Sequence, residues 1–200
     1  MKKDIDKIAD YLLLRSADMQ DVGFFHGKTG VVAALYLYAD ACGDDVLRDF
    51  AWELFQQVYD GVHTEMPLGL ERGLAGIGYA TAWLCRRGLL EGSLNDTLAD
   101  IDAKIMEHDP RRLTDMSVRT GVGGLLLYLR LRQSVEPVAT FDASYLSELQ
   151  AVAAARGVSC AGPDLLPLLS APSFDAAEYV GRPLGIDGGS SYYLLKFAGV

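Results

Sequence analysis

The chain has 200 residues, and 50% of them are hydrophobic. This composition is enough to fill one hydrophobic core, whereas the length is too short for two domains to be expected. We therefore predict a single domain over residues 1–200. The formal net charge is −9, and Lys and Arg never run longer than two, which argues against nucleic acid or an anionic membrane as a partner. No apolar run is long enough for a signal peptide or a membrane span, so we expect a cytoplasmic protein.

Segments with a single apolar stripe alternate along the chain with segments that are apolar on every side. In the first striped segment, Ile5, Ile8 and Leu12 fall at helical spacing with charges between them. A striped segment is typical of a helix that lies on a core, whereas a helix that is apolar all round is buried. The striped segments are 5–13, 46–58, 94–105 and 141–156, and the apolar segments are 27–41, 73–85, 121–131 and 188–197.

Start and stop signals agree with these segments. Asp44 and Asp45 can cap the second striped helix, Gly88 follows an apolar helix, and Asp109-Pro110 ends the third striped one. No stretch alternates with period two between hairpin turns. We therefore predict an all-α fold of two concentric layers, a complete or partial α/α toroid of about four helical hairpins. A HEAT-like solenoid has a similar period, but both helices of its repeats keep an exposed face.

A repeated glycine motif opens the apolar segments. Three of the copies contain a Gly-x-x-Gly pair, and residues Gly185 to Tyr192 form a degenerate fourth copy. The pairs are Gly27/Gly30, Gly73/Gly76 and Gly121/Gly124. The best-matched stretches are 67–73 and 183–189. The first three copies lie 46 and 48 residues apart and the last two lie 68 apart, so roughly twenty residues are inserted before the last copy.

Glycine at these positions has two compatible explanations. Each glycine costs about 1 kcal/mol relative to alanine inside a helix, so a compensating gain is expected. The interpretation that we favour is close approach of the inner helices where they converge at one end of the ring. The functional interpretation is that helix N-termini with unpaired backbone N–H groups face a shared opening at one end of the ring, where they bind a carboxylate or a phosphate.

With these motifs, the sequence resembles the lanthionine synthetase C-like family, whose α/α toroid also begins its inner helices with Gly-x-x-Gly. The closest matches are 25–30 and 73–79, and the resemblance spans most of 23–198. Related toroids among glycoside hydrolases and terpene cyclases share the architecture. A complete toroid of the family is much longer than this chain. The resemblance thus implies either a half ring, closed by a partner or by self-association that covers its apolar flanks, or a reduced relative.

Active cyclases of the family hold a catalytic zinc with two cysteines and a histidine, one cysteine being followed directly by His-Gly. This chain has no such sequence, and no metal-ligand spacing can be read among its cysteines and histidines. We therefore expect no metal, no cofactor and no zinc-dependent cyclisation. The isolated residues are Cys42, Cys85, Cys160, His26, His63 and His108.

Polar residues just before the glycines form the candidate site. His26, Arg72 and Thr120 share one phase of the repeat, and a histidine there is more often a backbone hydrogen-bond partner than a catalyst. Glu71 and Asp187 also share a phase. Paired carboxylates suit acid/base hydrolysis of a glycosidic bond, but acidic residues before a helix also stabilise its dipole, which is the interpretation that we favour.

The loop 109–115 contains adjacent arginines. Arg111 or Arg112 can bind a ligand carboxylate, or pair with Asp109 and Asp115, and we favour the internal pairing. We expect a lanthionine synthetase C-like protein that binds a peptide or a peptide-modifying enzyme without catalysing cyclisation. The alternative is a toroid glycoside hydrolase with Glu71 and Asp187 as its acid/base pair. The ligand-binding candidates are His26, Glu71, Arg72, Arg111, Arg112, Arg119 and Asp187, and the catalytic candidates are Glu71, Asp187 and His26.

Overall fold

A computed structural model of the chain describes residues 2–63, 65–136, 141–158 and 165–200. These residues form helices and loops, with no strand among them, which confirms the all-α class. Their contacts group the chain into two compact units, residues 1–62 with 164–200 and residues 63–163. The chain leaves the first unit and later returns to it, and this grouping does not test the prediction of one domain. Each unit is described by itself.

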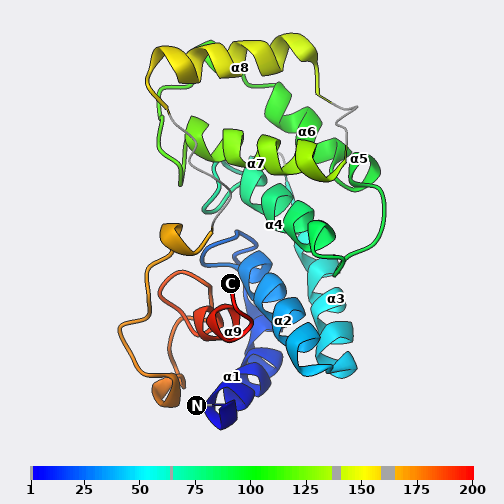
Figure 1. The fold of residues 1–200 in the computed structure, drawn as a ribbon, viewed down its shortest axis with the longest axis vertical. Helices are drawn as coiled ribbons and strands as arrows, with labels where there is room; N and C mark the ends of the chain where they lie inside the picture. The colour runs from blue at the N-terminus through cyan, green and yellow to red at the C-terminus, as the bar shows by residue number, and fades with distance from the viewer. Residues whose placement is uncertain (1, 64, 137–140, 159–164) are drawn as a thin grey trace. The chain divides into compact units, whose positions relative to one another are not determined.

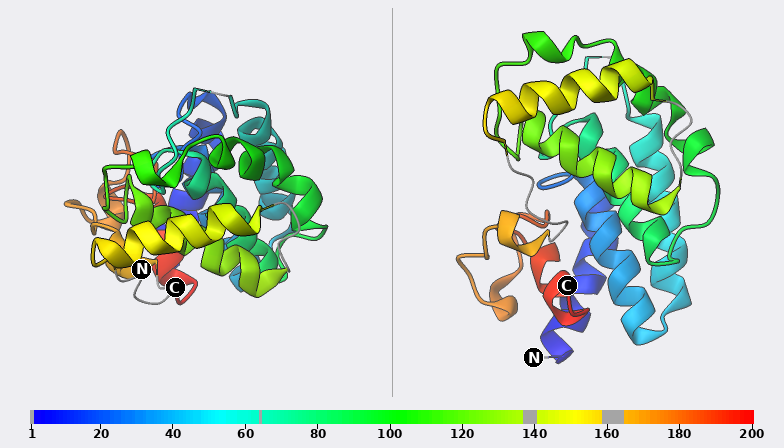
Figure 2. Two further views of the ribbon diagram at one scale, coloured as in Figure 1. Left: turned by 90° about the horizontal axis from the view of Figure 1, so that it is seen from above. Right: turned by 45° about the horizontal axis from the view of Figure 1, so that its top comes forward.

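The first unit is centred on α2 (Figure 1). Helix α2 contacts α3 and α9, and α9 also contacts α1; the two further views in Figure 2 again show α9 beside α2. Every residue of α2 from Lys28 to Ala39 is buried, as predicted for an inner helix. The elements of this unit are α1 (Lys2–Arg15), η1 (Ser16–Asp18), α2 (Lys28–Cys42), α3 (Asp45–Asp60), η3 (Leu166–Leu168), η4 (Ala176–Glu178) and α9 (Ser191–Phe197), where η marks a 3₁₀-helix.

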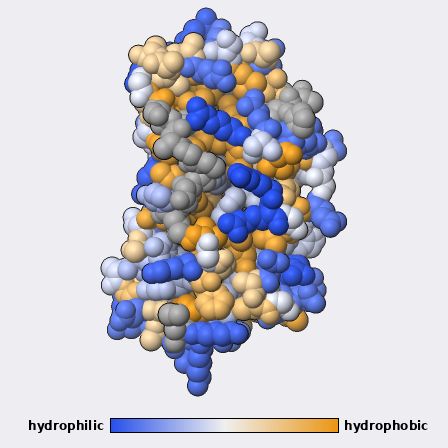
Figure 3. Space-filling model, viewed as in Figure 1, coloured by the Kyte–Doolittle hydropathy of each residue, from blue (hydrophilic) through white to orange (hydrophobic). Residues whose placement is uncertain are grey.

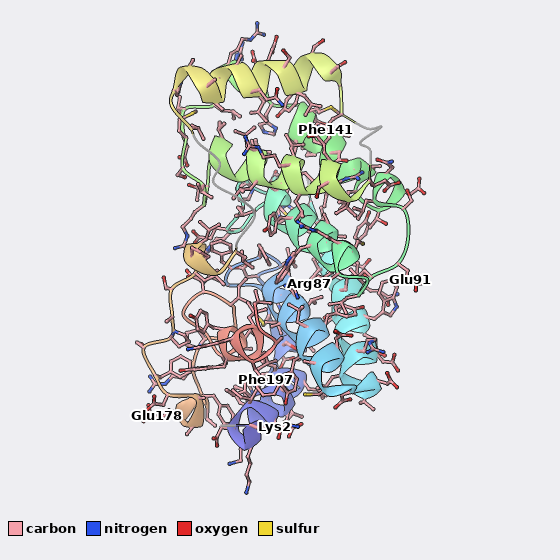
Figure 4. The ribbon with its side chains drawn as sticks, in the orientation of Figure 1. Lys2, Arg87, Glu91, Phe141, Glu178 and Phe197 are labelled. Atoms are coloured by element: carbon pink, nitrogen blue, oxygen red, sulfur yellow. The ribbon has the colours of Figure 1, made fainter. Side chains whose placement is uncertain are left out.

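Helices α1 and α3 bury one side each, as their stripes predict. Gly43 ends α2 in the left-handed region at φ 68°, and Asp44 then accepts a hydrogen bond from the Leu47 N–H over 3.0 Å, which caps α3. Helix α9 differs from the predicted fully apolar segment, since Lys196 is exposed. Its apolar side is still used: the Phe197 ring, labelled in Figure 4, lies 5.4 Å from the Tyr38 ring of α2.

The second unit is centred on the pair α4 and α7, with α6 against α4 and α8 against α7. All of α4 from Leu74 to Leu84 is buried. Helix α8 is capped by Asp142, which accepts hydrogen bonds from the N–H groups of the first turn, and it buries one side only. The elements are α4 (Leu74–Arg86), α5 (Leu94–Thr97), α6 (Ala99–Met106), η2 (Pro110–Arg112), α7 (Val122–Val135) and α8 (Ala143–Ala155).

Two details of the second unit differ from the sequence prediction. The third striped segment is two helices rather than one, because the backbone at Leu98 (φ −106°, ψ 7°) leaves helical geometry between α5 and α6. Helix α7 extends past the predicted end at residue 131, and it buries a charge. The Arg132 side chain is 0% exposed and donates to Asn95 Oδ1 over 2.7 Å. The buried Tyr128 hydroxyl donates to the Asp102 carboxylate, which lies 3.7 Å from Arg132.

The surface carries no sign of a membrane-spanning segment in the part of the chain that is described. None of the helices there combines the length and the apolar character needed to cross a bilayer. Figure 3 shows hydrophilic and apolar residues interspersed on the face seen in Figure 1.

Candidate functional site

The four glycine motifs form the same turn, each immediately before a helix. Aligned on the glycine, they are the ten-residue segments 21–30, 67–76, 115–124 and 183–192, which precede or open α2, α4, α7 and α9. In every segment the N–H of the eighth residue donates to the carbonyl oxygen of the first. These bonds join Lys28 to Asp21 (2.8 Å), Leu74 to Pro67 (2.9 Å), Val122 to Asp115 (2.9 Å) and Ser190 to Pro183 (2.8 Å). The structure thus shows that all four copies of the motif, including the degenerate fourth one, form the same hydrogen-bonded turn.

This turn explains the glycine that all four segments share at the seventh position. A Cβ atom on Gly27, Gly73, Gly121 or Gly189 would lie closer than 3.0 Å to the carbonyl oxygen of the first residue in its own segment. The close approach that we predicted between inner helices is therefore, at these positions, an approach of each motif to itself. A close approach between two buried helices occurs elsewhere, since a Cβ on Gly78 of α4 would lie 2.5 Å from the Tyr128 ring of α7.

The motifs cross in pairs, one pair in each unit. In the first unit, a Cβ on Gly185 would lie 2.6 Å from His26 Cα, and the Asp187 N–H donates to the Phe25 carbonyl oxygen over 3.0 Å. We call this arrangement, of 21–30 with 183–192, the first crossing.

The second unit repeats the arrangement with different residues. A Cβ on Gly69 would lie 2.6 Å from Thr120 Cα, and the Glu71 N–H donates to the Arg119 carbonyl oxygen over 2.8 Å. The contacting positions are the same in both units: the third residue of one motif meets the sixth of its partner, and the two fifth residues are joined. Residues 67–76 and 115–124 form the second crossing.

The first crossing brings together two of the predicted site residues. His26 Nε2 lies 3.6 Å from Asp187 Oδ2, and Asp187 Oδ1 accepts a hydrogen bond from the Ser170 N–H over 2.5 Å. The Asp187 side chain is 8% exposed. Asp187 therefore ties motif 21–30 to the inserted segment that precedes the last motif. Ser170 could not be predicted from its side chain, because the contact is made by its backbone N–H.

The second crossing brings together three of the predicted residues. The Glu71 carboxylate lies 2.9 Å from Arg119 Nε and 3.9 Å from Arg72 Nε, and its side chain is 20% exposed. Ion pairing of a half-buried carboxylate over 2.9 Å is a charge-assisted contact. Glu71 and Asp187 thus occupy equivalent positions of two crossings in different units, and each carboxylate is engaged within its own unit.

The adjacent arginines pair internally, as we favoured. Arg111 donates to Asp109 through Nε (3.0 Å) and through a terminal nitrogen (3.2 Å), and these hydrogen bonds lower the pKa of the Asp109 carboxyl below its ordinary value. Arg112 Nε lies 3.8 Å from Asp109, beyond hydrogen-bond distance. Asp115 has other partners: it accepts hydrogen bonds from the Thr120 hydroxyl (2.6 Å) and the Ser117 N–H (2.8 Å).

A hollow of about 220 Å³ lies in the second unit at the start of α7. Arg112, Asp115 and Thr120 supply polar groups to its wall, and the Arg112 side chain is 88% exposed. The apolar part of the wall includes Leu68, Leu113 and Leu125. We call this feature the α7 hollow. It combines the Arg112 guanidinium and an apolar surface with the Asp115 carboxylate, to which the Thr120 hydroxyl donates, so the guanidinium is the group in its wall that suits a ligand carboxylate.

Metal chemistry finds no support among the described residues. Within them, no three His, Cys, Asp or Glu side chains are grouped as a metal site. Cys42 is exposed and Cys85 is partly buried, and both are reduced. Burial raises the pKa of the Cys85 thiol, which keeps it protonated. Cys160 lies outside the described residues.

No protein-family model matches this chain. A search of curated proteins finds no match either. The resemblance to lanthionine synthetase C-like proteins therefore stays a prediction, based on the glycine motifs alone.

Proposed function

We propose that the chain is a lanthionine synthetase C-like binding protein that has no cyclase activity and holds a peptide in the α7 hollow. The observation that carries the proposal is the hollow itself, where Arg112 stands 88% exposed beside Thr120 and apolar side chains. The likeness to the family is supported by the recurrence of one turn in four motifs, each just before or at the start of a helix. The missing Cys-His-Gly sequence supports the absence of cyclisation.

The chemistry of the hollow favours an acidic peptide. Arg111 is occupied by Asp109, whereas Arg112 is not hydrogen-bonded to that carboxylate. A ligand carboxylate would gain charge-assisted hydrogen bonds from the Arg112 guanidinium. The leucines of the wall would receive a neighbouring apolar side chain. The ligand class is therefore a peptide with an acidic residue, or its terminal carboxylate, next to an apolar residue.

The binding proposal is tested with a fluorescently labelled peptide of alternating Leu and Glu, and a matched peptide with Gln in place of Glu. We expect the Glu peptide to bind more tightly, and Arg112→Ala to weaken it about tenfold, as the loss of roughly 1.4 kcal/mol implies. Arg182→Ala, an exposed arginine of the first unit, is the matched control. Equal binding of both peptides, or no loss in Arg112→Ala, would contradict the proposal.

The absence of cyclase chemistry has its own test. Protein purified without chelators is analysed for metal, and we expect less than one zinc per chain. One tightly bound zinc per chain would overturn this part of the proposal.

The glycoside hydrolase alternative has less support. Each carboxylate already has partners within its own unit, Arg119 for Glu71 and both His26 and Ser170 for Asp187. An activity screen on oligosaccharides, with Glu71→Gln beside the unmodified protein, separates the two functions. Turnover that is lost in Glu71→Gln would favour the hydrolase.

A further inference from the structure

The outward face of α3 exposes large aromatic side chains. Trp52 is 46% exposed and Tyr59 is 38% exposed, although the opposite side of the same helix is buried against α2. Trp and Tyr are the residues most enriched at the centres of protein interfaces, where they supply large contact area at low entropic cost. This face lies in the first unit and shares no residue with the α7 hollow.

The two aromatic residues lie along one line of the helix. Seven residues separate them, which is two turns, so they project from one face at a spacing of about 10 Å along the axis. The centre of the Trp52 ring lies 5.9 Å from that of the buried Phe55 ring, at an interplanar angle of 31°. The exposed ring is therefore backed by a residue of the core.

The charges around these rings have one sign. Asp49, Glu53 and Asp60 are exposed on α3. Arg48 is the single basic residue of the helix, and it is 2.8 Å from Asp45, which neutralises it locally. A second copy of this chain, with its formal net charge of −9, is a poor match for such a face. A basic partner is complementary to it.

We propose that the α3 face, defined by Asp49, Trp52, Glu53 and Tyr59, docks a helix of a partner protein that carries Lys or Arg beside apolar residues. A cation of the partner would stack on Trp52, where cation–π attraction is strongest. The neighbouring carboxylates would pair with further cations, which sets orientation and makes association depend on salt. This surface is independent of the proposed peptide site.

The test uses an 18-residue amphipathic helical peptide of Leu and Lys, with a Leu and Glu peptide of the same pattern as its counterpart. Trp52 is itself the reporter, since the only other tryptophan, Trp83, is 7% exposed. We expect the Lys peptide to change the tryptophan fluorescence and the Glu peptide to leave it unchanged. Trp52→Ala, followed with a labelled Lys peptide, should weaken binding about tenfold or more.

A charge-matched pair of variants separates a local surface from general attraction. Asp49→Asn with Glu53→Gln should weaken the Lys peptide about fivefold or more. Asp10→Asn with Asp18→Asn changes the net charge equally on exposed sites of the same unit and should have less than about half that effect. Equal effects of the two double variants, unaltered binding in Trp52→Ala, or failure of the Lys peptide to bind would overturn the proposal. So would a concentration-dependent dimer that buries Trp52, because a second copy would then be the occupant.

Discussion

The Glu71 carboxylate lies 2.9 Å from the Arg119 guanidinium, while the Glu71 N–H donates to the Arg119 carbonyl oxygen over 2.8 Å. The same two residues are thus joined through backbone and side chain. Asp187 repeats the backbone bond with Phe25 but turns its carboxylate towards His26. One backbone frame therefore carries two different side-chain pairs, a carboxylate with a guanidinium and a carboxylate with an imidazole.

The energy of the Glu71–Arg119 ion pair is measurable by a double-mutant cycle. Glu71→Gln, Arg119→Met and the double variant are compared by urea denaturation. We expect a coupling energy of about 1 kcal/mol, because the pair is partly exposed and screened. Glu71→Gln with Arg72→Met is the matched cycle and should give a smaller value, since that pair is 3.9 Å apart. Equal coupling in the two cycles would contradict this assignment.

Gly73→Ala should destabilise the second unit by about 3 kcal/mol, because the new Cβ would overlap backbone atoms of 67–69 that cannot move away. Gly88→Ala is the control: its position is open, and only the left-handed backbone at φ 71° is penalised, by about 1–2 kcal/mol. The free energy of unfolding in urea measures both. A Gly73→Ala protein as stable as Gly88→Ala would show that the motif turn relaxes.

Arg132→Met should cost about 3 kcal/mol, since it leaves the fully buried Asp102 carboxylate without its nearest cation. Adding Asp102→Leu to Arg132→Met should recover part of that loss, because buried charge is then removed on both sides. Equilibrium unfolding of the two proteins decides the matter. A double variant less stable than Arg132→Met alone would mean that Asp102 has another indispensable partner.

Stability should fall at acidic pH through Asp115. The hydrogen bond from the Thr120 hydroxyl, and then that from the Ser117 N–H, lower the pKa of this carboxyl below its ordinary 3.8. The unfolded state thus takes up the proton first, so this contribution is present above about pH 4 and is lost as pH falls through the lowered pKa. Asp115→Asn should flatten the decline of stability between about pH 5 and pH 2. Asp10→Asn is the control. An equally flattened pH dependence of stability in Asp10→Asn would contradict the assignment of this effect to Asp115.

The order of the helices could be predicted because the spacing of apolar residues along a helix reflects which of its sides are buried. The alternation of striped and apolar segments placed the main helices, and the glycine motif identified the starts of α2, α4, α7 and α9. The break at Leu98 was missed, since Leu98 fits the apolar stripe on either side of it. Arg132 was missed because a charge next to an apolar run is usually exposed. Its burial is made tolerable by Asp102 and Asn95, which precede it by 30 and 37 residues, together with Glu136.

The repeat predicted which residues occupy equivalent positions, but not which of them pair with one another. The repeat put Glu71 and Asp187 in one phase, and the structure gives them equivalent positions. Which motif faces which depends on contacts between distant parts of the chain, which no local pattern encodes. The sequence therefore could not reveal that His26 meets Asp187 while Arg119 meets Glu71.

The first crossing joins segments that ribosomes produce far apart in time. Motif 183–192 emerges about 160 residues after motif 21–30, whereas both motifs of the second crossing lie within the continuous stretch 63–163. During synthesis, the second unit can thus form its contacts before α9, which packs on α2, has been made. Over that interval, the apolar surface of α2 that α9 later covers is open to non-native contacts. Premature release of the nascent chain would therefore leave the first unit, and not the second, incomplete.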